Sequence, residues 1–116
     1  MPSSASTIEA LGRLDPRRRE WIEEFRDRLR ALLGARLKDL RLFGSEARGQ
    51  GSAESDIDLL VLVDGLDVAT WRSILDMAHM ISPWLSPLIE DYERYHAPRS
   101  RATGIYRAIR EDSVRL

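Results

Sequence analysis

The segment from Asp56 to Val63 constrains the fold more than any other part of this chain. It reads DIDLLVLV, so every position after its two aspartates is apolar. A strand that is apolar on both faces is typical of the middle of a sheet that is covered on both sides. Because side chains at i and i+2 point to the same face of a strand, Asp56 and Asp58 are expected to lie side by side at its start.

Two amphipathic segments lie before and after this strand and predict helices. The first begins at Pro16, with Asp15 as N-cap and Gly34 as its stop, and the second runs from Asp67, as N-cap, to a break at Pro83. The residues predicted to form their buried faces are Trp21, Ile22, Phe25, Leu29, Leu32 and Leu33 in the first helix and Trp71, Ile74, Leu75, Ala78 and Ile81 in the second.

The remaining pattern completes a small layered domain. Residues 37–43 and 85–89 read as further strands, and Pro87 places the latter at an edge. Short helices are expected from Gly44 to Arg48 and over 104–111. Residues 1–14 read as a flexible lead-in, and 15–116 as a single domain. The order of elements predicts an α/β (α+β) fold, a mixed sheet of about three strands flanked by about four helices.

Composition narrows the class of function. The 116 residues carry a net charge of −1, which does not indicate binding to nucleic acid. The chain has no cysteine, so metal sites with thiolate ligands are excluded. No apolar run approaches the roughly 20 residues of a membrane span, and we expect a cytoplasmic protein. The basic run 17–19 precedes Glu20, Glu23 and Glu24, which predicts a solvated helix face of mixed charge. His96, in a polar tail, is expected to be solvated.

One motif contains residue types that are suited to binding phosphate and a metal ion. Gly44 and Ser45 end the strand over 37–43, and ten residues separate them from Asp56. A glycine-serine turn can expose backbone N–H groups to an anion. Two carboxylates on one face can bind a hard divalent cation such as Mg2+. Together these features predict a site for a metal-bound phosphate compound.

This motif closely resembles the signature of the DNA polymerase β-like nucleotidyltransferase superfamily. The short chain and the sequence GSEARG over 44–49 look more narrowly like the minimal nucleotidyltransferase (MNT) family. The resemblance covers most of the chain and implies the nucleotidyltransferase fold. It also implies that Gly44, Ser45 and Arg48 contact the phosphates of ATP or another NTP, and that Asp56 and Asp58 are catalytic and bind Mg2+.

The sequence departs from the fuller members of this superfamily at one position. Those enzymes carry a third carboxylate on the next strand, where this chain has Trp84 or Ser86. Glu90 and Asp91 follow the predicted strand, and either could substitute for the third acid.

The resemblance implies transfer of a nucleoside monophosphate, AMP from ATP, to an acceptor hydroxyl. Minimal members of the family commonly pair with a HEPN-domain toxin and act as its antitoxin, modifying a tyrosine of the toxin. A second reading is a degenerate MNT subunit that neutralises a HEPN partner by binding alone. In either reading the chain could be part of a homo- or hetero-oligomer. A third is a transferase acting on a small molecule such as an aminoglycoside.

Overall fold

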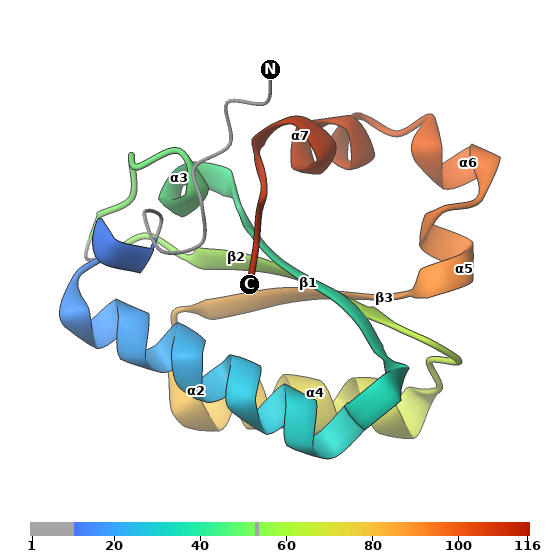
Figure 1. Cartoon of the computed structure of the whole chain (residues 1–116), viewed down its shortest axis with the longest axis horizontal. Helices are drawn as coiled ribbons and strands as arrows, with labels where there is room; N and C mark the ends of the chain where they lie inside the picture. The colour runs from blue at the N-terminus through green and yellow to red at the C-terminus, as the bar shows by residue number, and fades with distance from the viewer. Residues whose placement is uncertain (1–10, 53) are drawn as a thin grey trace.

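The computed structural model describes residues 11–52 and 54–116, and it contains one four-stranded sheet (Figure 1). The strands are β1 (Leu37–Phe43), β2 (Ile57–Val63), β3 (Leu85–Asp91) and β4 (Val114–Arg115), and their order across the sheet is β3-β2-β1-β4. The predicted mixed α+β fold is therefore confirmed, with β2 central and β3 at an edge. The predicted number of strands was one too low, because the two residues of β4 are too few to show an alternating pattern.

The register of the sheet determines which residues neighbour the start of β2. β2 runs antiparallel to β1 and parallel to β3. Asp58 is paired with Phe43 on β1 and with Ser86 on β3. Phe43 is followed directly by Gly44, so the end of β1 and the start of β2 bring the two halves of the motif together.

Helices cover both faces of the sheet (Figure 1). On one side lie α2 (Pro16–Leu33), which continues into a short 3-10 turn over Gly34–Arg36, and α4 (Val68–Ile81). On the other side lie four short helices. These are α3 (Gly44–Ala47), α5 (Tyr92–Tyr95), α6 (Pro98–Arg101) and α7 (Gly104–Asp112). α5 and α6 were not predicted, because each has only four residues and shows no helical repeat.

The predicted caps of the two long helices are confirmed. The Asp15 carboxylate accepts hydrogen bonds from the N–H groups of Arg17 and Arg18, and that of Asp67 accepts one from Thr70. Gly34 closes α2 with a φ of +54°. These carboxylates satisfy N–H groups that have no partner within the helix, which fixes where each helix begins.

The core has two parts, one on each face of β2. The odd-numbered positions of β2 pack against α2 and α4, with Phe25 and Ile74 fully buried, and the even-numbered positions Leu60 and Leu62 pack under α5 and α7. Leu32 and Trp71 were expected in the first part, but they are 50 % and 39 % exposed. Both lie at the border of their helix's apolar stripe, where spacing alone does not separate core from surface.

Two further findings concern the ends of the chain and membranes. Of the predicted lead-in, residues 1–10 lie outside the described residues, whereas Leu11 and Leu14 pack against the core. Among the described helices, none has the length and apolar character needed to span a bilayer.

Candidate functional site

Gly44 and Asp58 are packed against each other at the start of β2. A Cβ atom at Gly44 would overlap Oδ2 of Asp58 and would lie 3.2 Å from its carboxyl carbon. Gly44 also has a φ of +75°, in the left-handed region that side-chain-bearing residues avoid. Steric room and backbone conformation therefore both require glycine here, and the Asp58 carboxylate lies directly against the backbone of the turn.

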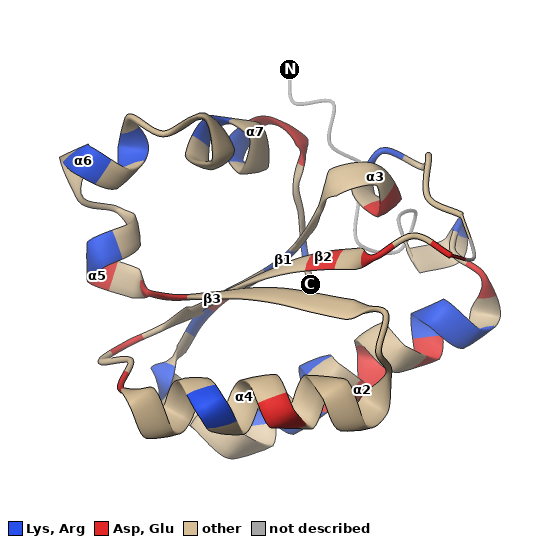
Figure 2. Ribbon diagram, turned by 180° about the vertical axis from the view of Figure 1, so that it is seen from behind, with Lys and Arg blue, Asp and Glu red and all other residues tan. Residues whose placement is uncertain are grey.

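Asp56 and Asp58 lie close enough to influence each other electrostatically. Asp56 is exposed and directly precedes β2, and Asp58 is half-buried within it. Burial, with a smaller contribution from the Asp56 charge, raises the pKa of Asp58, and Arg48 opposes this shift. The two carboxylates thus repel each other, and Arg48 supplies nearby positive charge. Figure 2 shows the acidic start of β2 beside α3.

Ser45 lies in α3, which is a single turn of helix. Its carbonyl oxygen accepts a hydrogen bond of 2.8 Å from the N–H of Gln50. The Gln50 side chain in turn accepts one of 3.3 Å from Nε of Arg48. These bonds fold the segment after α3 back toward the turn, so that Gly44, Ser45 and Arg48 form one compact unit.

A buried ion pair that sequence analysis missed holds this unit to α2. Nη2 of Arg18 lies 3.2 Å from Oε1 of Glu46, and each side chain is only 4 % exposed. The same nitrogen donates a hydrogen bond to the carbonyl oxygen of Ser55, the residue before Asp56. Arg18 therefore links α2, α3 and the start of β2, three segments that are distant in sequence.

Gly51 makes room for this ion pair. A Cβ atom at Gly51 would overlap Oε1 of Glu46 and would lie 3.1 Å from its Cγ. The loop after α3 therefore crosses directly over the buried carboxylate.

The sequence contained a weak signal for Arg18. The basic run 17–19 was interpreted as a solvated face, yet Arg18 lies four residues before the buried Ile22 and seven before the buried Phe25. That spacing places Arg18 on the buried stripe of the helix. Its partner is 28 residues further along the chain, so the pairing itself could not be found from local pattern.

Of Trp84 and Ser86, the two positions considered for a third carboxylate, Ser86 is the one that lies beside Asp58 in the sheet. It is the residue paired with Asp58, and parallel neighbours in register point to the same face. Glu90 is paired with Leu62, four residues further along β2, or about 13 Å from Asp58 at 3.3 Å per residue. Glu90 therefore lies at the far end of the strand from the aspartates.

Asp91 has a structural role instead. Its carboxylate accepts hydrogen bonds from the N–H groups of Leu66 and Arg94, each at 3.1 Å, and caps α5. These bonds lower the pKa of Asp91. Neither Glu90 nor Asp91 lies near Asp58, so neither completes the site in this chain.

The donor set that remains fits a magnesium ion that is shared with a substrate. Within residues 11–52 and 54–116 no group of three or more His, Cys, Asp or Glu side chains is arranged to hold a metal. Mg2+ typically binds through one or two carboxylates and completes its shell with water and substrate phosphates. Asp56 and Asp58, with their mutual repulsion, match that requirement.

Comparison with known proteins agrees with this geometry. Residues 22–103 match the family described as "Nucleotidyltransferase domain", which is well over half of the chain. A protein of Methanocaldococcus jannaschii named "Putative protein adenylyltransferase MJ0604" is 46 % identical over 43 residues. That alignment covers 37 % of this chain and 43 % of the relative, so the chain matches less than half of the relative's length.

A solved structure shares the fold. It is described as a "putative nucleotidyltransferase" from Sulfolobus solfataricus, with a TM-score of 0.52 and 23 % sequence identity. The match covers 99 % of this chain and 89 % of the other. At this level of identity the likeness concerns the arrangement of helices and strands.

Proposed function

Because this chain belongs to the nucleotidyltransferase domain family, we propose that it transfers AMP from ATP to an acceptor hydroxyl. The observation that carries the proposal is the fit of the Asp58 carboxylate against Gly44, which a side chain at position 44 would prevent. The turn and the carboxylate are thereby held together as one site, next to Asp56 and Arg48.

In this proposal each residue of the motif has a distinct task. Asp56 and Asp58 hold Mg2+, which supplies charge neutralisation for the phosphates and for the leaving pyrophosphate. Gly44 lets the backbone approach the phosphates, and Ser45 offers its N–H and hydroxyl to a phosphate oxygen. Arg48, which already lies near Asp58, adds positive charge where negative charge accumulates.

The acceptor in this proposal is a protein hydroxyl. The name of the M. jannaschii relative, a protein adenylyltransferase, supports a protein over a small molecule. The resemblance to MNT antitoxins points to a tyrosine of a HEPN-domain toxin in the cytoplasm. Complex formation would bring that hydroxyl to the α-phosphate and supply the orientation that a small domain alone does not.

Ser86 favours a second candidate function. Because Ser86 leaves β3 without the third carboxylate beside Asp58, the chain would be a degenerate subunit that neutralises its HEPN partner by binding alone. Phosphoryl transfer depends mainly on positioning and on the charges around the phosphate. Two carboxylates with Arg48 therefore retain the larger part of that machinery, and we favour the enzyme.

One experiment separates the two candidates. The chain is incubated with Mg2+, ATP labelled at the α-phosphate, and a HEPN-domain protein as the acceptor. The enzyme predicts that label enters the partner, that the partner gains the mass of AMP, and that Asp56→Asn abolishes both changes. An unlabelled partner that is still bound and neutralised would establish the binding-only subunit.

The matched control is Asp64→Asn. Asp64 is an exposed aspartate at the other end of β2, and its side chain is not part of the motif. This variant changes the net charge by the same amount and should transfer AMP at the wild-type rate.

A further inference from the structure

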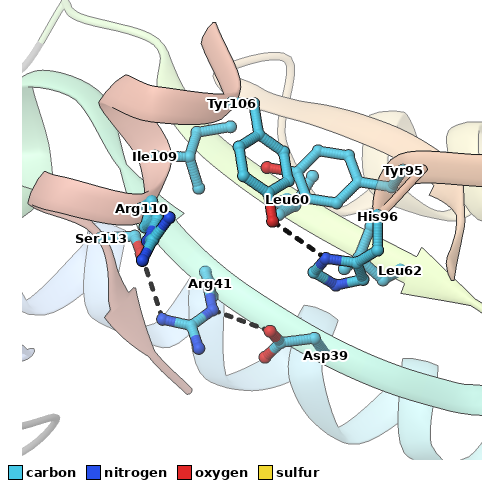
Figure 3. A pocket seen from close by; sticks show the side chains of 10 residues that line it. All are labelled: Asp39, Arg41, Leu60, Leu62, Tyr95, His96, Tyr106, Ile109, Arg110 and Ser113. Atoms are coloured by element: carbon cyan, nitrogen blue, oxygen red, sulfur yellow. Dashed lines mark hydrogen bonds and ion pairs between the residues drawn. The ribbon is translucent and has the colours of Figure 1, made fainter. Parts of the chain in front are cut away.

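A cavity of about 170 Å³ lies between the sheet and the short helices α5 and α7 (Figure 3). Its floor is formed by Leu60 and Leu62, which are fully buried beneath it. The residues that line it are Asp39, Arg41, Leu60, Leu62, Tyr95, His96, Tyr106, Ile109, Arg110 and Ser113. None of these residues belongs to the motif described above, so the cavity has no role in the phosphate site itself.

The cavity and the phosphate site lie on the same face of the sheet. Asp58, Leu60 and Leu62 are alternate residues of β2, and alternate residues of a strand share a face. Leu60 and Leu62 are therefore about 7 Å and about 13 Å beyond Asp58 along the strand, at 3.3 Å per residue. α7, which roofs the cavity, also contacts α3 at the phosphate site.

One wall of the cavity is aromatic. The rings of Tyr95 and Tyr106 lie 4.9 Å apart between centroids, and His96 Nδ1 is 3.1 Å from the Tyr106 hydroxyl (Figure 3). His96 was expected to be solvated, but it is half-buried in this cluster. Burial and the neighbouring Tyr106 raise the pKa of Tyr95 to about 12, so its hydroxyl stays neutral.

The opposite wall is polar and held in place. Arg41 donates to Asp39 at 2.7 Å and to the hydroxyl of Ser113 at 3.2 Å, and Arg110 lies beside them (Figure 3). A leucine floor, aromatic rings on one side and fixed polar groups on the other suit a flat ring with a hydrogen-bonding edge. The volume suits a ring system and not a whole nucleotide.

We propose that this cavity binds the heteroaromatic base of the nucleotide whose phosphates lie at Gly44, Asp56 and Asp58. This inference rests on the proposed function and names the subsite that anchors the nucleotide's other end. The ribose separates the base from the α-phosphate. This agrees with a cavity that begins at Leu60, the next residue after Asp58 on the same face of β2. The acceptor hydroxyl must instead touch the α-phosphate, so it belongs beside the aspartates and not in this cavity.

Calorimetry with two probes tests the inference. Mg·ATP carries a base, and Mg·tripolyphosphate carries only the phosphate chain. Removal of an aromatic wall by Tyr106→Ala should weaken ATP binding by at least about fivefold, the smallest loss expected for one base–aromatic stack, and leave tripolyphosphate unchanged. Tyr106→Phe keeps the ring and should bind ATP within about twofold of wild type. Equal effects of Tyr106→Ala on both probes would overturn the inference.

A second measurement does not depend on the phosphate site. Adenosine, which has no phosphate, should shift the ring-proton NMR signals of Tyr95, Tyr106 and His96. If N-acetyl-tyrosinamide shifts these signals and adenosine does not, the cavity accommodates the acceptor and the inference is wrong. If adenosine shifts them while tripolyphosphate binds equally to wild type and Asp56→Asn/Asp58→Asn, the proposed function fails and the base site stands.

Discussion

At the scale of single residues, two glycines and one arginine determine how closely the motif is packed. Gly44 accommodates the Asp58 carboxylate, Gly51 accommodates Glu46, and Arg18 neutralises Glu46 from α2. The residues of the motif could be singled out from the sequence because their types and spacing match those expected for phosphate and metal chemistry. The supporting contacts could not, since each joins a residue to a partner whose closeness only the fold determines.

Gly44→Ala should disable nucleotide binding without unfolding the chain. The added Cβ displaces the Asp58 carboxylate, whereas Gly65→Ala, with a similar φ of +67° and nothing within 4 Å, introduces only backbone strain. That strain is about 1–2 kcal/mol for either variant. Thermal melts with and without Mg·ATP are the measurement. ATP should raise the melting temperature of wild type and Gly65→Ala only, and an equal rise in Gly44→Ala would contradict the steric argument.

Arg18→Met should lower the free energy of unfolding by about 3–5 kcal/mol, because Glu46 would remain buried without its counter-charge. Arg19→Met, at the next residue, is the control. It removes an exposed ion pair with Glu23 and should lower the free energy of unfolding by at most about 1 kcal/mol. Urea melts give both values. The double variant Arg18→Met/Glu46→Leu should recover most of the loss, and a failure to recover would mean that Arg18 stabilises the fold by another route.

At the scale of elements, the long helices and the central strands could be predicted from pattern. Their N-caps and stops, and most residues of their apolar stripes apart from Leu32 and Trp71, agree with the structure because these signals are local. The short elements α5, α6 and β4 could not, since four or two residues carry no periodicity. The register between β2 and β3 is likewise set by packing, and it shows that Ser86 and not Glu90 or Asp91 neighbours Asp58.

That register predicts a gain of function. Ser86→Asp places a third carboxylate on the strand beside Asp58 and should raise the rate of AMP transfer about tenfold, equivalent to 1.36 kcal/mol of transition-state stabilisation. Ser86→Asn, of nearly the same size but without charge, is the control and should not raise it. The measurement is the single-turnover rate of AMP transfer to the partner, compared between wild type and both variants. A rate that is unchanged or lower in Ser86→Asp would show that this position does not serve the reaction.

Tyr95, which lies in α5, is expected to make the free energy of unfolding depend on pH at high pH. The folded-state pKa of Tyr95 is about 12, above its ordinary value of 10.0, chiefly because the phenol is buried. A raised pKa means that the neutral phenol favours the folded state below pH 10, and that this contribution is lost as the pH rises toward 12. In urea melts, the free energy of unfolding of wild type should therefore fall relative to that of Tyr95→Phe as the pH rises above 10. A constant difference between them up to pH 12 would contradict the assignment.

At the scale of the whole molecule, the two faces of the sheet have different roles. The α2 and α4 side of the sheet (Figure 1) holds the larger core. The other side carries the motif at one end of β2 and the aromatic cavity further along the strand. Arg18 of α2 contacts Glu46 of α3 and the carbonyl oxygen of Ser55, so α2 holds the segments of the motif in place directly. We infer that nucleotide and acceptor meet on the α3–α7 side, where the Asp58 carboxylate lies.

We propose above all that Gly44, Asp56 and Asp58 form a magnesium-dependent site for a nucleoside triphosphate. Calorimetric titration of the full chain with ATP, with Mg2+ and then with EDTA, tests it most directly. We predict saturable binding that requires Mg2+ and is lost in Asp56→Asn/Asp58→Asn, while Asp64→Asn binds as wild type does. Equal binding by wild type and the double variant, or binding that is indifferent to EDTA, would contradict it.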